Sequence, residues 1–167
     1  SRPFEKKRTK SLSEEFWIEE IFTNKNNYID GEIRCGIKGN DFWNGSVEVH
    51  IDIEKFKNEH YAGFGYLEVP SKIDNRGIGT TLMLSVIDII KTFKEFYSVG
   101  ETVSVSGWLS TADKQNGNWK KSVPLYENIG QLAKVESYFT IKNDENHYTA
   151  KEFLCRSNDD GHIIYLI

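Results

Sequence analysis

The sequence is poor in cysteine and has no long apolar run. Its 167 residues include two cysteines, Cys35 and Cys155, which are too few for a disulfide framework. No apolar stretch approaches the roughly 20 residues that cross a bilayer, and the charged N-terminus lacks the apolar stretch of a signal peptide. We therefore expect a cytoplasmic protein with free thiols and no membrane partner. The spacing of cysteine and histidine matches no metal site, so no metal is predicted.

The sequence also lacks an excess of positive charge. It holds 21 Lys and Arg against 25 Asp and Glu, a formal net charge of -4, so a nucleic-acid partner is not expected. Residues 1–10 are a basic exception, and we predict a flexible N-terminal segment there. The alternative is an arm that touches RNA or another acidic partner. Residues 11–167 contain no repeat and no linker, which predicts a single domain.

Alternation of apolar and polar residues predicts six strands. They cover residues 29–37, 47–53, 63–69, 102–110, 134–142 and 162–167. Turn-forming residues join the first two strands, which predicts an antiparallel hairpin with a longer loop. The polar residues 111–117 predict a loop.

Three helices are predicted from apolar residues at helical spacing. Residues 11–22 predict a short helix, and a broad apolar stripe predicts a longer one after Gly79. Residues 119–129 predict a third, whose first turn should begin just before Pro124 because proline is tolerated there. We expect Gly130 to end it. The predicted fold class is α/β (α+β), with a single mixed, largely antiparallel sheet flanked by helices.

The most informative segment is residues 66–83, which predict a strand, a polar loop with two glycines, and a helix start. Gly77 and Gly79 have no Cβ, so a ligand can approach their backbone closely. The helix that follows directs free N–H groups and its positive dipole end at the loop. Such a corner is an anion site, and it predicts a cofactor that carries phosphate.

Two other phosphate-binding motifs do not fit this corner. A dinucleotide-binding fingerprint needs a third glycine where Leu82 stands, and no parallel series of strands follows. A P-loop needs Gly-Lys-Ser/Thr, which is absent from the sequence.

Two motifs resemble those of the GCN5-related N-acetyltransferase (GNAT) superfamily. The acetyl-CoA signature of that family is matched in register by Leu67, Val69, Gly77, Ile78 and Gly79. A second family pattern, in the helix after the next strand, is matched by Leu125-Tyr126-Glu127-Asn128-Ile129-Gly130. The order and spacing of the two motifs suit the predicted helix and strand between them.

The sequence departs from the family pattern at several positions. Asp74 stands where the family usually has Arg or Gln, and Lys72 and Arg76 offer compensating positive charge. Trp119 stands where an asparagine is common, with Asn118 one step before it. The N-terminal helical region, which in the family shapes the acceptor pocket, is reduced to at most one helix.

The resemblance implies an acetyl-CoA-dependent N-acetyltransferase with acetyl-CoA as the acyl donor. The backbone of Leu67 and Val69 would pair with pantetheine, and the Val69 N–H would hold the thioester oxygen. Tyr126 would protonate the leaving thiolate as general acid. The pyrophosphate would be bound by the backbone N–H groups of Asn75, Arg76, Gly77, Ile78, Gly79 and Thr80.

The general base is not fixed by the sequence. Glu68 lies beside the thioester strand and is the candidate, although alternation alone also explains it as a solvent-facing residue. Glu48, His50 and Asp52 share one face of a strand, and we interpret them as a polar sheet face rather than a metal or base cluster.

Two other functions remain open at this point. The chain could be a catalytically silent acyl-CoA-binding or sensing module. It could also be a transferase that modifies tRNA or protein and uses residues 1–10 as a handle. The amine acceptor is not fixed by the sequence, and a homodimer is left open.

Overall fold

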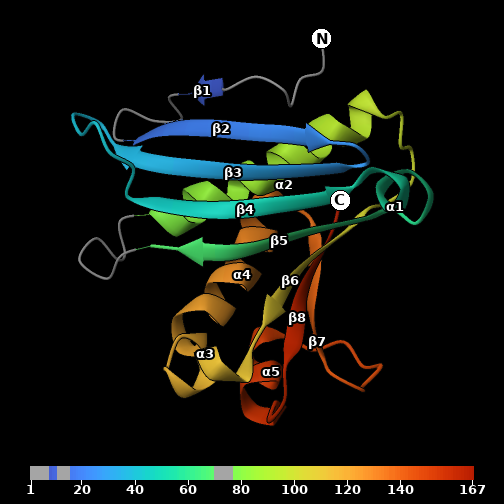
Figure 1. The fold of residues 1–167 in the computed structure, drawn as a ribbon. Coiled ribbons are helices and arrows are strands. Elements are labelled where there is room, and N and C mark those ends of the chain that lie inside the picture. The colour runs from blue at the N-terminus through green and yellow to red at the C-terminus, as the bar shows by residue number, and fades with distance from the viewer. Residues whose placement is uncertain (1–7, 11–15, 70–76) are drawn as a thin grey trace.

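One sheet of eight strands organises the residues that the computed structural model describes, which are 8–10, 16–69 and 77–167. The strand order is β1-β2-β3-β4-β5-β6-β8-β7 (Figure 1). The strands are β1 (Arg8–Lys10), β2 (Phe16–Lys25), β3 (Tyr28–Ile37), β4 (Gly45–Asp52), β5 (Tyr61–Glu68), β6 (Ser104–Leu109), β7 (Glu136–Ile141) and β8 (Gly161–Leu166). Among these, β5 and β6 form the one parallel pair, so the predicted mixed, largely antiparallel sheet is confirmed.

Five helices lie between the described strands. They are α1 (Ile53–Asn58), α2 (Ile78–Phe96), α3 (Thr111–Gln115), α4 (Trp119–Ala133) and α5 (Ala150–Arg156). The long helix α2 runs along the sheet half formed by β2 to β5, whereas α3, α4 and α5 accompany β6 to β8 (Figure 1). Since none of these helices combines the length and apolar character of a membrane-spanning segment, no such segment is found in the described part of the chain.

The core lies between one face of the sheet and the helices. In β4, Val47, Val49 and Ile51 are buried on this face, while Glu48, His50 and Asp52 alternate onto the other. The antiparallel hairpin of β3 and β4 is confirmed. The alternation of apolar and polar residues thus predicted strands β3 and β4 and the sheet face on which the core lies.

The helix predicted over residues 11–22 is wrong for the described part of that segment. Phe16–Lys25 is strand β2, which pairs with β3 over ten residues. Phe16, Ile18 and Phe22 are buried on alternate positions, but buried Glu20 interrupts the apolar alternation and hides it in the sequence. Residues 11–15, which include the start of the predicted helix, lie outside the described residues.

The boundaries predicted for the third helix are also wrong. Helix α4 begins at Trp119, so Pro124 lies inside it. Trp119 is buried against the ring of Phe153 at a centroid distance of 4.9 Å, and this packing favours the additional turn before the proline. Gly130 does not end α4 either, because the helix continues to Ala133.

Several short elements were not predicted. Residues 111–117, expected to be a loop, contain α3, and α1 and α5 were not predicted either. Helix α5 had a sequence signal, a capping box in which the Thr149 hydroxyl accepts from the Glu152 N–H and the Glu152 carboxylate accepts from the Thr149 N–H. Residues 8–10 of the N-terminal segment form β1, which pairs with β2.

Both cysteines are free thiols, as predicted. Cys35 is buried, and burial raises its pKa to about 11, whereas Cys155 is exposed. A buried thiol of raised pKa is a poor nucleophile.

The backbone of β7 lies close to Gly161 at the start of β8. A Cβ placed there would lie 2.2 Å from the carbonyl oxygen of Thr140. We expect Gly161→Ala to lower the free energy of unfolding by about 1–3 kcal/mol, because the neighbouring strand must shift. Gly100→Ala is the control, since a Cβ there meets no atom within 4 Å. Urea unfolding of both variants checks this, and equal stabilities would contradict it.

Candidate active site

Strand β5 pairs with β6 over only four of its eight residues. Their register runs from Tyr61 opposite Ser104 to Phe64 opposite Gly107 and then ends. Beyond that point β5 continues to Glu68 and β6 to Leu109, and the two strands diverge (Figure 1). The backbone of β5 after Phe64 therefore has no described strand on its β6 side, which leaves polar groups for a ligand.

A bulge in β5 lies at the same place. Gly65 is opposite Glu48 and Glu68 is opposite Ser46, so three steps along β5 match two along β4. Tyr66, the residue in the bulge, has the left-handed φ of 51°. A bulge changes the direction in which the following backbone groups point, and bulges are common beside active sites.

A cavity of about 800 Å³ fills the space between the diverging strands and the helices. From the strands and the loop before β4, its lining includes Trp43, Leu67, Glu68, Val69, Trp108 and Leu109. From the helices and the residues next to them, it includes Gly77, Ile78, Gly79, Thr80, Asp113, Asn118, Lys121, Ser122, Leu125 and Tyr126. Both motifs identified in the sequence thus meet in one cavity.

The N-terminus of α2 forms one wall of the cavity. Gly77 caps the helix with a φ of 86°, a conformation that favours glycine, and no side chain caps the first turn. The first backbone hydrogen bond of the helix runs from the Thr81 N–H to the Gly77 carbonyl oxygen, at 2.9 Å. The three preceding N–H groups therefore have no partner within the helix, and its first turn contains no acidic residue. This wall is suited to an anion.

Tyr126 forms the opposite wall. It lies on α4, is 8% exposed, and packs against the ring of Phe64 at a centroid distance of 5.8 Å. The backbone carbonyl of Tyr126 accepts a hydrogen bond of 2.7 Å from the Tyr165 hydroxyl, which fixes this turn of α4. Burial raises the pKa of Tyr126, and the negative charge of Asp113 raises it further. Its phenol therefore stays protonated at neutral pH and can act as a proton donor.

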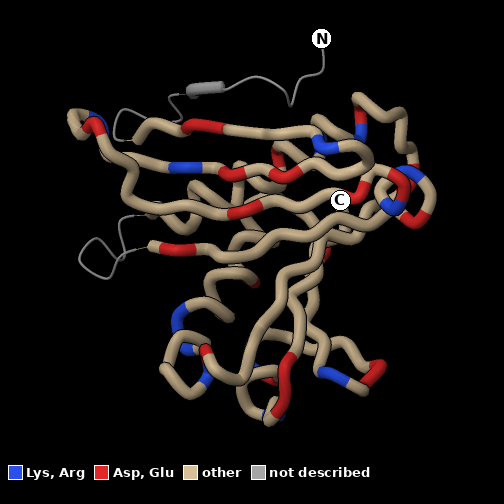
Figure 2. The backbone as a smooth tube through the Cα atoms, viewed as in Figure 1, with Lys and Arg blue, Asp and Glu red and all other residues tan. Residues whose placement is uncertain are grey.

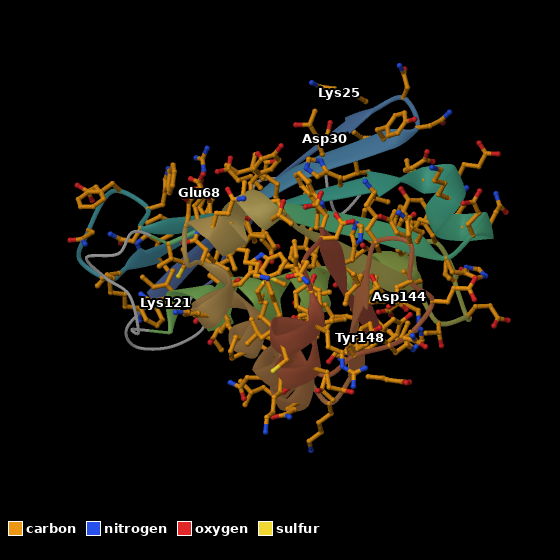
Figure 3. The ribbon with its side chains drawn as sticks, turned by 90° about the horizontal axis from the view of Figure 1, so that it is seen from below. Lys25, Asp30, Glu68, Lys121, Asp144 and Tyr148 are labelled. Atoms are coloured by element: carbon orange, nitrogen blue, oxygen red, sulfur yellow. The ribbon has the colours of Figure 1, made fainter. Side chains whose placement is uncertain are left out.

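Three charged residues belong to the cavity lining. Glu68, at the end of β5, is exposed, and Asp113 and Lys121 line the helical side. Figure 3 shows Glu68 and Lys121 on the same side of the molecule. This side therefore offers both a proton acceptor and a positive charge.

The structure brings most of the predicted site residues together. The cavity lining includes Leu67, Glu68, Val69, Gly77, Ile78, Gly79, Thr80 and Tyr126. Asn75 and Arg76 lie outside the described residues. At the family's asparagine position, Trp119 is buried in the core, while its neighbour Asn118 lines the cavity.

Several cavity residues were not predicted as site residues, among them Trp43, Trp108 and Asp113. Trp108 had a sequence signal, because it occupies the polar side of an alternating strand. A tryptophan that is 63% exposed on a sheet face is unusual. Trp43 and Asp113 lie in segments of turn-forming and polar residues and had no comparable signal.

The polar face of β4 carries a hydrogen-bonded chain rather than a metal cluster. His50 Nδ1 lies 3.0 Å from Asp30 Oδ1, and His50 Nε2 lies 3.1 Å from Glu48 Oε2. Within residues 8–10, 16–69 and 77–167, no group of three or more acidic, histidine or cysteine side chains is arranged to hold a metal ion.

Comparison with known proteins finds similar solved structures. No family model and no curated protein matches the sequence. A structure described as a GNAT-family acetyltransferase from Desulfovibrio desulfuricans matches with a TM-score of 0.48 at 14% identity, over 83% of this chain and 67% of that one. Diaminobutyrate acetyltransferase from Paenibacillus lautus was solved in complex with its substrate and coenzyme A. It matches with a TM-score of 0.48 at 10% identity, over 81% of this chain and 69% of that one.

A third match is Naa50 from Arabidopsis thaliana, in complex with a bisubstrate analogue that contains CoA. Its TM-score is 0.47 at 14% identity, over 80% of this chain and 70% of that one. The likeness of these structures to this chain is distant.

The raised pKa of Tyr126 can be tested by titration. The protein has eight tyrosines, and ordinary tyrosines ionise with a pKa of about 10. We expect Tyr126→Phe to leave the tyrosinate absorbance formed up to about pH 11 unchanged, because Tyr126 is still protonated there. Circular dichroism at each pH confirms that the fold persists. Loss of one tyrosinate equivalent in the variant would show that Tyr126 titrates normally.

Proposed function

We propose that this protein is an acetyl-CoA-dependent N-acetyltransferase of the GNAT type. The observation that carries the proposal is the cavity between the diverging strands β5 and β6, which joins a bulged strand, a helix N-terminus without a side-chain cap and a buried tyrosine. An elongated molecule with a phosphate end and a reactive thioester end fits such a cavity. The apolar side chains of Leu67 and Leu125 suit its middle part.

The acyl donor would be bound mainly by backbone groups. The N–H groups at Gly77, Ile78, Gly79 and Thr80 would bind the pyrophosphate, together with Asn75 and Arg76 from the loop before them. Leu67 and Val69 would pair with the pantetheine arm as an additional strand. The Val69 N–H would donate to the thioester oxygen and stabilise the negative charge that forms there.

Glu68 and Tyr126 would transfer the protons of the reaction. Glu68 would take one proton from the ammonium form of the acceptor. As the amine nitrogen bonds to the thioester carbon and the carbon–sulfur bond breaks, Tyr126 would protonate the sulfur. The second proton leaves the new amide nitrogen and restores the Tyr126 phenol, while Glu68 releases its proton to solvent. The net products are the amide, the free thiol of coenzyme A and one proton.

The alternative is a module that binds acyl-CoA without turnover. The exposure of Glu68 favours this alternative, because the surroundings of an exposed carboxylate do not adapt it to act as a general base. Binding of acetyl-CoA without thiol release from any amine would identify this function. In contrast, an enzyme that modifies tRNA would bind RNA in a salt-sensitive way that depends on residues 1–10.

Gly79→Glu tests the anion-binding wall. We expect acetyl-CoA at about 100 times its Kd to stabilise the parent protein by about 2.7 kcal/mol in thermal unfolding. The variant should lose this effect, because a carboxylate would occupy the phosphate position. The fold should survive, since a Cβ at Gly79 would meet side-chain ends, Leu125 Cδ2 at 3.2 Å and Val69 Cγ2 at 3.8 Å.

Lys91→Gln is the control for Gly79→Glu. It makes the same change of one unit in net charge at an exposed position of α2, away from the cavity. The control should bind acetyl-CoA like the parent. Equal binding by Gly79→Glu would place the phosphate elsewhere, and a parent stabilised by ATP or NAD but not by acetyl-CoA would refute the proposed function.

Tyr126→Phe tests the general acid and separates enzyme from sensor. The variant keeps the ring that packs on Phe64 and loses only the hydroxyl. We expect kcat to fall by about 100- to 10,000-fold, with acetyl-CoA affinity nearly unchanged because the hydroxyl acts in the transition state. The assay is free-thiol release with a panel of amines. An unchanged kcat would mean that Tyr126 only packs.

A further inference from the structure

The loop between β3 and β4 lies at the end of the sheet where β5 ends and α2 begins (Figure 1). It covers residues 38–44, and hydrogen bonds fix its last part. The Asn44 N–H donates to the Cys35 carbonyl oxygen at 2.7 Å, and the Asn44 side-chain oxygen accepts from the Ile37 N–H at 3.0 Å. Trp43, the residue before this anchor, is therefore held in a defined position.

The end of this loop packs against β5 and α2. Gly45 begins β4, and a Cβ there would lie 3.0 Å from the Glu68 carbonyl oxygen and 2.8 Å from Ile78 Cγ2. The Glu68 carbonyl and the Val69 N–H belong to one planar trans peptide group, so they point in opposite directions. Since the carbonyl lies on the β4 side, the Val69 N–H is directed away from β4, toward the divergence of β5 and β6.

Trp43 lies at the end of the cavity where this peptide group is. It precedes Gly45 by two positions and lines the cavity together with Glu68 and Val69. Its side chain is 43% exposed, so the protein covers the rest of the indole. An indole is large and rigid. Trp43 therefore forms a wall beside the N–H group that would bind the thioester oxygen.

Arg34 supports this wall from β3. Its guanidinium carbon lies 5.5 Å from the ring centroid of Trp43, Nη1 lies 3.4 Å from Glu19 Oε1, and Nη2 lies 3.2 Å from Glu32 Oε2. In Figure 2, acidic positions on β2, β3, β4 and β5 surround the basic position of β3. The hydrogen bond to Glu32 is the main cause that raises the pKa of Arg34. A guanidinium held by two carboxylates gives the indole a fixed surface on which to stack.

A second tryptophan of the cavity is less enclosed. Trp108 lines the cavity from β6 and is 63% exposed. It also lines a groove of about 370 Å³ on the sheet face opposite to the core, together with Tyr28 and Tyr61. Trp43 lines the cavity but not this groove. A fixed limit on the size of a bound group is therefore better formed by Trp43.

We propose that Trp43, held in place by Arg34, limits the acyl group of the donor to a short chain. The inference rests on the proposed function. An acyl chain longer than acetyl, attached to a thioester at the Val69 N–H, would meet the indole. Trp43 then sets the specificity for the donor by contact, and Arg34 is a positioning residue that acts through the indole.

The first experiment compares acetyl-CoA with hexanoyl-CoA. Calorimetry on the full chain gives the Kd of each donor without any amine, and we expect the parent protein to bind acetyl-CoA more tightly. Trp43→Ala should change the ratio of the two Kd values by at least about 10-fold in favour of hexanoyl-CoA, because it makes room for the chain. Trp43→Phe keeps an aromatic ring and should keep the parent preference.

Phe42→Ala is the control for Trp43→Ala. Phe42 is the neighbouring aromatic residue of the same loop, is 63% exposed and does not line the cavity. It should therefore keep the parent ratio of Kd values. If Phe42→Ala and Trp43→Ala changed the ratio equally, the effect would come from the loop as a whole, and the role of the Trp43 ring would be overturned.

Arg34→Met tests the support with the indole still present. It removes the guanidinium and keeps an unbranched apolar side chain, and we expect the ratio of Kd values to shift in the same direction as in Trp43→Ala, by a smaller factor. A purely structural loss would weaken both donors equally and leave the ratio unchanged. Arg156→Met is the control, since Arg156 makes the same type of contact with Tyr148, at 5.8 Å, outside the cavity lining.

The outcomes separate this inference from the proposed function. Equal affinity of the parent protein for the two donors, or an unchanged ratio in Trp43→Ala, would overturn the inference and leave acetyl transfer intact. A rise in the KM of amines in Trp43→Ala, with the donor preference unchanged, would also overturn it, because Trp43 would then contact the acceptor. Absence of acetyl-CoA binding to the parent protein would instead refute the proposed function itself.

Discussion

The site depends on the point at which β5 and β6 stop pairing. Parallel strands share hydrogen bonds as long as their backbones stay adjacent, and here they do so only as far as Phe64 and Gly107. A Cβ at Gly107 would lie 2.3 Å from the Phe64 ring, so the glycine makes room for the ring that supports Tyr126. The bulge at Tyr66 then redirects β5. The cavity forms because the sheet opens there.

The two sides of this opening have different chemistry. On the helical side, the first turn of α2 supplies N–H groups that have no partner within the helix, and α4 supplies a buried phenol. On the other side, the groove lining carries the exposed aromatic rings of Tyr28, Tyr61 and Trp108. Trp108 borders both.

Local sequence patterns predicted the wrong element or the wrong helix boundary where long-range packing decides the structure. Phe16–Lys25 has apolar residues compatible with either period, and pairing with β3 makes it a strand. Pro124 should start a helix, yet burial of Trp119 extends α4 one turn further back. Gly130 was predicted to end that helix, but a Cβ there would lie 2.6 Å from the Ser137 hydroxyl. Position 130 is a glycine because β7 lies close to it, not because the helix ends there.

The sequence by itself determined the local pieces of the site. The strand–glycine–helix corner around Gly77 and the helix that carries Tyr126 were predictable, because dihedral preferences and apolar periodicity act within a few residues. Only the tertiary structure decided that they face one cavity, and that Trp108 joins it to a groove on the other face. These features depend on where the pairing of β5 and β6 ends, and that pairing joins segments about 40 residues apart, whose register no local pattern fixes.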